Sequence, residues 1–252
     1  MKRFSVLRIL VLALMPSILG AVFGAVELSK KELRQAQAAN LTVRGARSQG
    51  APSRPAELQI SNAPIATRVL VESPAETDAE LQIICLFQSA PGNTLHGSLV
   101  EINEKLKGLL DKIRRPEFFR GELGETTVII PPAGSLGARK LLVLGLGDSG
   151  NFTTQRMELV GSIVYRESNR LGAAHPFFAP AILDGGVTKF ATGEVAEHFY
   201  AGFLRAARTE KLLEKNGVSA GQVLEDLTFL AGPTHAADTQ KGLEAEARKL
   251  PN

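Results

Sequence analysis

The chain has 252 residues, of which 44% are hydrophobic and 22% are charged, and this composition excludes an intrinsically disordered protein. The net charge is +3, from 29 Lys and Arg against 26 Asp and Glu residues. The excess lies in Lys2, Arg3 and Arg8, because residues 1–26 contain no acidic residue and the rest of the chain carries 26 basic and 26 acidic side chains. A body without net charge gives no electrostatic support for nucleic-acid binding, so we expect no nucleic-acid partner.

The N-terminus has the pattern of a secretory signal peptide. A short basic segment precedes an uncharged, apolar run over residues 9–26 that ends in small residues. We predict a signal peptide over residues 1–24, cleaved after Gly24 or alternatively after Ala21. The other interpretation is an uncleaved membrane anchor, because a run of this length can just span a bilayer. Cleavage would give an exported protein, periplasmic or extracellular, without stable membrane association.

Residues 25–57 are expected to connect the signal peptide to the folded body. Residues 27–41 can form a short charged helix, and residues 42–57 are rich in Gly, Pro, Ser and Arg, which is typical of a linker. We therefore place the folded domain at residues 58–252. The single cysteine, Cys85, cannot form an internal disulfide and lies in an apolar run, so we expect it to be buried.

Strand-like and helix-like patterns alternate along this domain. The predicted strands are 81–87, 125–130, 140–144, 177–183 and 227–231, and the predicted helices are 98–113, 153–171, 195–215 and 236–249. Ser98 is expected to cap the first helix, whose apolar residues form one stripe. Strands separated by helices require crossover connections and a mainly parallel sheet, so the fold class is α/β.

A glycine-rich turn after the third predicted strand is the candidate ligand-binding site. It fits the pattern G-x-G-x-x-G between a strand and a helix, where backbone N–H groups can hold phosphate. The alternative is a tight turn that needs glycine for its backbone angles, and the acidic residue expected about 20 positions on, Glu167, falls inside a helix. The candidate residues are Gly145, Gly147, Asp148, Ser149, Gly150 and Asn151.

Two further constellations are weighed and set aside. The segment around Ser149 is similar to the nucleophile segment of chymotrypsin-like proteases, but His175 follows the serine in the chain and those enzymes are all-β. Glu194, Glu197 and His198 share one helical face without a zinc-binding motif, which indicates a solvated face. We expect no metal and no cofactor.

Four segments in a distinctive order resemble the N-terminal domain of the leucyl (cytosol) aminopeptidase family. They are 81–87, the helix 99–113, the segment 119–126, and 140–147 with Phe152 and Thr153. The resemblance covers residues 80–185 well and extends more weakly to about residue 250. It implies a three-layer sandwich similar to the macro domain, with a mainly parallel or mixed sheet flanked by helices and without catalytic residues.

The resemblance also implies that catalysis belongs to a second domain. That domain holds two divalent metals with a lysine and carboxylates around an N-T-D-A-E-G-R-type loop, and no such stretch occurs in this sequence. We therefore expect no enzyme activity, because nothing would activate water.

Three functional interpretations remain open. The first is an exported, non-catalytic interaction module that docks onto a full-length aminopeptidase or another envelope protein. The second is a macro-like binder of a small phosphate or nucleotide ligand, with Gly145–Asn151 as the phosphate loop. The third is the regulatory half of a metalloaminopeptidase whose catalytic domain is encoded separately. The remaining possibility is a decayed fragment without function.

Overall fold

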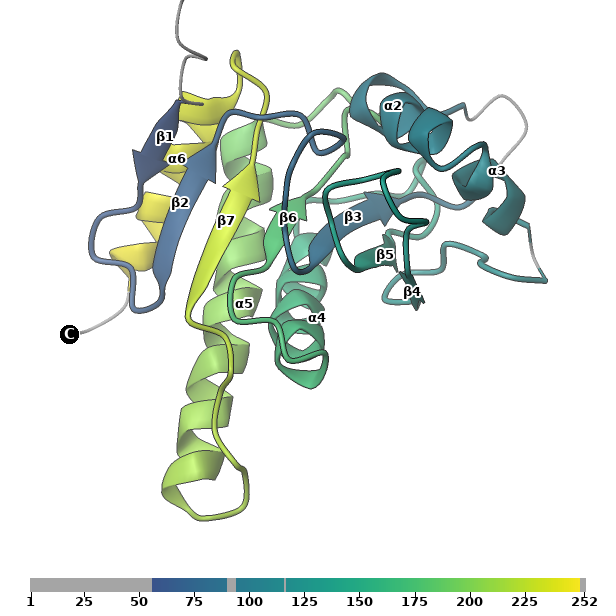
Figure 1. The fold of residues 1–252 in the computed structure, drawn as a ribbon. Helices are drawn as coiled ribbons and strands as arrows, with labels where there is room; N and C mark the ends of the chain where they lie inside the picture. Colours follow the sequence, from purple (N-terminus) through teal and green to yellow (C-terminus); the bar gives the residue numbers. More distant parts are fainter. Residues whose placement is uncertain (1–55, 90–93, 116, 250–252) are drawn as a thin grey trace, which may run out of the picture. The chain divides into compact units, whose positions relative to one another are not determined.

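The computed structural model describes residues 56–89, 94–115 and 117–249, so the predicted signal peptide and nearly all of the predicted linker lie outside it. The strands are β1 (Glu57–Gln59), β2 (Ala66–Leu70), β3 (Gln82–Leu86), β4 (Thr126–Ile129), β5 (Leu141–Gly145), β6 (Phe177–Ala179) and β7 (Asp226–Leu230). Within these residues they form one sheet in the order β1-β2-β7-β6-β3-β5-β4 (Figure 1). The five inner strands run parallel, and β1 and β4 are antiparallel edge strands.

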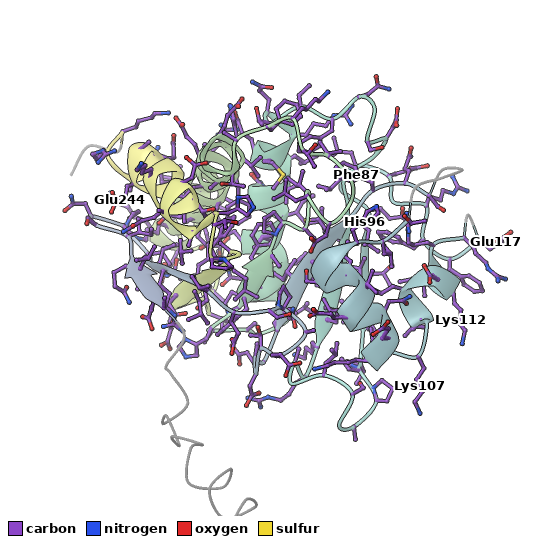
Figure 2. The ribbon with its side chains drawn as sticks, turned by 90° about the horizontal axis from the view of Figure 1, so that it is seen from above. Phe87, His96, Lys107, Lys112, Glu117 and Glu244 are labelled. Carbon is purple, nitrogen blue, oxygen red and sulfur yellow. The ribbon has the colours of Figure 1, made fainter. Side chains whose placement is uncertain are left out.

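Five described helices cover the two faces of this sheet: α2 (Gly97–Lys105), α3 (Leu109–Ile113), α4 (Arg156–Arg170), α5 (Thr192–Lys215) and α6 (Ala236–Ala247). The helices α4, α5 and α6 pack side by side on one face, and α2 and α3 lie on the other. Figure 2, seen from above, shows α6 and α2 on opposite sides of the strands. The architecture is a three-layer α/β/α sandwich, and the predicted fold class is confirmed.

Strand β3 shows why the sheet needs a helical layer on each face. All five of its residues are buried, as expected for a parallel strand written as an unbroken apolar run. Ile83 and Cys85 belong to the core under α4, α5 and α6, whereas Ile84 and Leu86 belong to the core under α2 and α3. Burial raises the pKa of the Cys85 thiol, so this cysteine is a small buried apolar residue, as predicted.

Three local predictions are wrong for identifiable reasons. The helix expected over 98–113 is two helices, because the backbone of Lys107 and Gly108 enters the left-handed region, with φ of 54° and 76°. Ser98 does not cap it, since the N-cap position belongs to His96 and Ser98 lies in the first turn. The strand expected over 177–183 ends at Ala179, before a proline that cannot donate to a neighbouring strand.

Candidate functional site

A cavity of about 690 Å³ opens at the carboxyl ends of β2, β6 and β7. Its position follows from the chain path: after β3 the chain turns to α2 on one face, and after the neighbouring β6 it turns to α5 on the other. In open α/β sheets, such a reversal leaves a crevice outside the carboxyl ends, where ligands bind. The volume lies within the range of roughly 300–1,000 Å³ found for small-molecule sites.

The connection from β2 to β3 leaves room for this cavity. Residues 71–81 contain no helix, and they cross from one side of β7 and β6 to the other. Val71, Glu72, Ser73 and Pro74 from this connection form one wall. The inner surface is mostly apolar, with residues from the ends of β6 and β7, the loop after β6 and the start of α5: Ala179, Ile182, Leu183, Phe190, Val195, Phe229 and Leu230.

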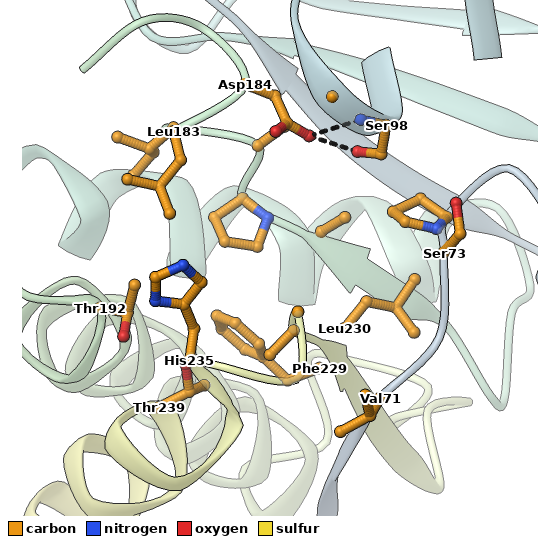
Figure 3. A pocket seen from close by; sticks show the side chains of 18 of the residues that line it. Val71, Ser73, Ser98, Leu183, Asp184, Thr192, Phe229, Leu230, His235 and Thr239 are labelled. Atoms are coloured by element: carbon orange, nitrogen blue, oxygen red, sulfur yellow. Dashed lines mark hydrogen bonds between the residues drawn. The ribbon is translucent and has the colours of Figure 1, made fainter. Parts of the chain in front are cut away.

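One end of the cavity carries a carboxylate that caps α2. Asp184, in the loop after β6, accepts hydrogen bonds from the backbone N–H of Ser98 at 3.1 Å and from the Ser98 hydroxyl (Figure 3). Its own carbonyl accepts the N–H of His96 at 3.0 Å. Gly97 is required here, because its φ is +49° and a Cβ would lie 2.8 Å from Cγ of Asp184. Asp184 therefore takes the position at the start of α2 that an anionic ligand would use.

The opposite end is built from the first turns of α5 and α6. His235 precedes α6, and Figure 3 shows its imidazole beside Thr192 and Thr239 at the cavity. Asp238 of α6 accepts the Thr192 hydroxyl at 2.9 Å and the N–H of Gly193 at 2.7 Å. The bond from Gly193 N–H is the main cause of the lowered pKa of Asp238. The His235 imidazole and the side chains of Thr192 and Thr239 thus form the polar part of the lining at this end.

The glycine-rich turn predicted from sequence lies after β5 and does not line the cavity. The N–H groups of Gly145, Leu146 and Gly147 bond to the carbonyls of Glu125, Leu86 and Gly121. Asp148 accepts the N–H of Gly150 at 3.0 Å and the side-chain amide of Asn151 at 2.6 Å. Asp148 and Gly150 are exposed and Ser149 between them is half-buried, and α4 begins only at Arg156. Phosphate binding by this turn stays a prediction.

The structure does not bring Ser149 and His175 together as a catalytic pair would require. Ser149 follows β5 at the carboxyl edge of the sheet, whereas His175 precedes β6 at the amino edge and bonds through Nδ1 to Asp226 at 2.6 Å.

Glu194, Glu197 and His198, on the helix face predicted to be solvated, each contact a different side chain. Glu194 accepts the Thr154 hydroxyl, Glu197 pairs with Lys249, and His198 lies 3.3 Å from Glu158. Within the described residues no group of three or more His, Cys, Asp or Glu side chains is placed to hold a metal ion.

Sequence reasoning missed Asp184, Ser98 and His235 as cavity residues. The available signal was the position of predicted strand ends, because the carboxyl ends of neighbouring parallel strands meet at one edge. None of the described helices is both long enough and apolar enough to cross a membrane.

Comparison with known proteins identifies relatives of this fold. Residues 83–207 match the cytosol aminopeptidase family, N-terminal domain. No curated protein matches the sequence significantly.

Two solved structures illustrate the likeness. A variant of tomato leucine aminopeptidase superposes with a TM-score of 0.53 at 18% identity, covering 75% of this chain and 37% of that one. A variant macrodomain of Oceanobacillus iheyensis gives 0.52 at 14% identity, covering 80% and 98%, and the same macrodomain with ADP gives 0.50 at 16%, covering 79% and 100%. The chain thus spans about a third of the aminopeptidase and almost the whole macrodomain.

Proposed function

We propose that this chain is a non-catalytic binding module that holds a small ligand. The match of residues 83–207 to the cytosol aminopeptidase family, N-terminal domain, and the macrodomain-like fold support this proposal. The cavity at the carboxyl ends of β2, β6 and β7 carries this proposal. It combines an enclosing apolar surface with a few polar groups at its two ends, as ligand sites do. That a macrodomain of this fold has been solved with ADP is compatible with a small ligand.

A cavity-filling variant tests this function. Ala231 lines the cavity just after β7, and its backbone bond to Leu70 does not depend on its side chain. Ala231→Trp should abolish binding of any ligand found by screening the purified chain for thermal stabilisation, since a ligand at 100 times its Kd adds about 2.7 kcal/mol. Ala237→Trp, at an exposed position on α6 outside the cavity, is the matched control and should keep binding. Equal binding by both variants would contradict the proposal.

The absence of catalysis is the second part of the proposal. It rests on the family pattern, which places the two metals in another domain, and on the lack of an N-T-D-A-E-G-R-type loop in these 252 residues. The test is hydrolysis of a leucine anilide with added manganese or zinc. Any turnover that a chelator abolishes would overturn this part.

A second candidate function is docking to another protein through the end of α5. Figure 1 shows α5 running well past the strands, and Leu212, Leu213 and Val218 at this end are exposed. We propose an aminopeptidase, full-length or separately encoded, or another envelope protein as the partner. Crosslinking in the native cell should recover a stoichiometric partner that a Leu212→Glu variant loses. Recovery of none, or equal recovery with the variant, would contradict docking.

Export completes the proposal and rests on the N-terminal sequence pattern. The mature chain isolated from the envelope or medium should begin at Ala25, or at Val22 for the alternative cleavage. Mass spectrometry of its N-terminal peptide checks this, and an intact Met1 in the cytoplasmic fraction would refute it.

A further inference from the structure

The charged side chains that line the cavity are all acidic. They are Glu72 from the β2–β3 connection, Glu101 from α2 and Asp184 from the loop after β6. Among residues 56–89, 94–115 and 117–249, no lysine or arginine belongs to this lining, and His235 is its one other titratable side chain. Carboxylates are ionised at neutral pH, so an apolar cavity with these groups at its mouth has a negative potential.

These carboxylates have neutral partners. Asp184 accepts from the N–H and hydroxyl of Ser98, and Glu101 accepts the Ser73 hydroxyl at 2.7 Å. Among the residues that the structure describes, none of the ion pairs includes Glu72, Glu101 or Asp184. Within the described residues, no basic side chain therefore neutralises these carboxylates, and only the start of α2 offsets the charge of Asp184.

Two lysines adjoin the cavity without belonging to its lining, one at the end of α2 and one beside the lining residue Phe190. Lys105, the lysine of α2, bonds to the Ala75 carbonyl and to Glu76, both outside the cavity lining. Lys189 lies over the ring of Phe190 with its Nζ 5.0 Å from the ring centroid. Phe190 and Phe229 present aromatic rings to the cavity, and such rings attract cations as well as apolar groups.

Anions meet the opposite conditions. The N–H of Ser98 at the start of α2 is the group that a phosphate would seek, and the Asp184 carboxylate already accepts it. A phosphate placed there would face Asp184 and Glu101 without a cationic side chain to offset the repulsion. The cavity lining therefore disfavours binding of the phosphate groups of a nucleotide.

We propose that the cavity selects a small organic amine, with its ammonium group at Asp184 and Glu101 and an apolar body against Phe190, Phe229 and the strand ends. This inference rests on the proposed function and adds the chemical class of the ligand. Ammonium groups donate charge-assisted hydrogen bonds to carboxylates, and the apolar surface favours a hydrocarbon body.

The test measures binding of five probes to the purified chain by changes in its amide chemical shifts. The probes are benzylamine, benzyl alcohol, 3-phenylpropionate, ADP and inorganic phosphate. Benzylamine should bind about tenfold more tightly than benzyl alcohol, the scale of one hydrogen bond to a charged group. The anions should not perturb the cavity residues. Raising the salt concentration should weaken benzylamine and leave benzyl alcohol unchanged.

Substitutions that each remove one carboxylate charge test where the ammonium group binds. Glu101→Gln should weaken benzylamine several-fold, whereas Glu104→Gln, on the same helix and outside the cavity lining, should not. Asp184→Asn keeps the shape of the side chain and should weaken benzylamine while reducing the exclusion of phosphate.

The outcomes separate the two claims. Equal binding of benzylamine and benzyl alcohol, or cavity binding by ADP or phosphate instead, would overturn the amine inference and leave a small-ligand site intact. Loss of benzylamine binding in both Glu101→Gln and Glu104→Gln would overturn the placement of the ammonium group. If no probe perturbs the cavity residues, the proposed small-ligand function itself fails.

Discussion

Helices α4 and α5 cross at Gly202, and the substitution Gly202→Ala tests how closely they must pack. A Cβ at this position would lie 2.5 Å from the carbonyl carbon of Glu158 and 2.7 Å from its Cα. These obstacles are backbone atoms of α4, which cannot rotate away. The variant therefore folds only if the two helices move apart at the crossing.

The size of this movement sets the expected cost. The carbonyl oxygen of Glu158 would lie closer to the added Cβ than either carbon does, so reaching ordinary contact at 3.4 Å requires the helices to separate by more than 1 Å. A gap of about 1 Å already forfeits up to about half of the dispersion energy of the atoms beside it. Overpacking costs about 1–3 kcal/mol, while alanine in place of glycine favours a helix by about 1 kcal/mol. The obstacle is rigid, and separation also stretches the 2.9 Å bond from Ser162 to the Gly202 carbonyl. We expect a net loss of about 2 kcal/mol.

Urea denaturation measures this loss directly. With an m-value of about 2 kcal/mol/M, the midpoint should fall by about 1 M with m unchanged. The control is Gly150→Ala, where a Cβ would meet the Asp148 carboxylate at 3.5 Å in ordinary contact; its stability should stay within about 0.5 kcal/mol of the parent. A Gly202→Ala variant as stable as the parent, or more stable, would refute the argument from close packing.

Three further predictions concern single side chains. Asp238→Ala should lower the free energy of unfolding by about 1 kcal/mol in urea denaturation at neutral pH, because Asp238 caps the N-terminus of α5. Since the pKa of Asp238 is lowered in the folded state, the parent should lose this advantage as the pH falls below about 4. An equal pH dependence of stability in the variant would contradict this. The hydrogen bond to Asp226 raises the pKa of His175, so its stabilisation should be complete below about pH 6.5 and decline as the pH rises through the folded value, and an NMR titration unchanged by Asp226→Asn would refute the cause. Cys85 should react with a thiol reagent only at the rate of unfolding, and fast labelling of the native chain would show that it is not buried.

The central part of the fold could be predicted because its signals are local. The buried runs of β3 and β5 and the apolar stripe of α4 each specify their element without help from the rest of the chain. The break between α2 and α3 at Lys107 and Gly108 could not be predicted from the stripe of apolar residues over 98–113. Leu106 and Leu110, on either side of the break, still pack into the same core, so the apolar spacing does not record it. The edge strand β1 is three residues long and gives no period to detect.

The cavity could be predicted only in outline. Its two polar ends join residues as far apart in sequence as Ser98 and His235, and only the strand order brings them to one edge. Strand ends at residues 183 and 231 were predicted, the first of them four residues beyond the observed end of β6 at Ala179, and their adjacency was not predicted. That Asp184 caps α2 depends on an 86-residue separation, for which no local pattern exists.

Two glycines of the pattern after β5 have a packing cause, which is the alternative weighed for this turn in the sequence. A Cβ at Gly145 would lie 2.7 Å from the carbonyl carbon of Gly121, and Gly147 has φ of +75°, so both positions require glycine before any ligand is considered. Their N–H groups are bonded within the fold, whereas a phosphate loop must leave such groups free for the ligand. These glycines therefore have a structural reason that does not depend on phosphate. The ligand proposed here is placed instead where the chain reverses between β3 and β6, and there the Asp184 carboxylate at the start of α2 favours a cationic over an anionic group.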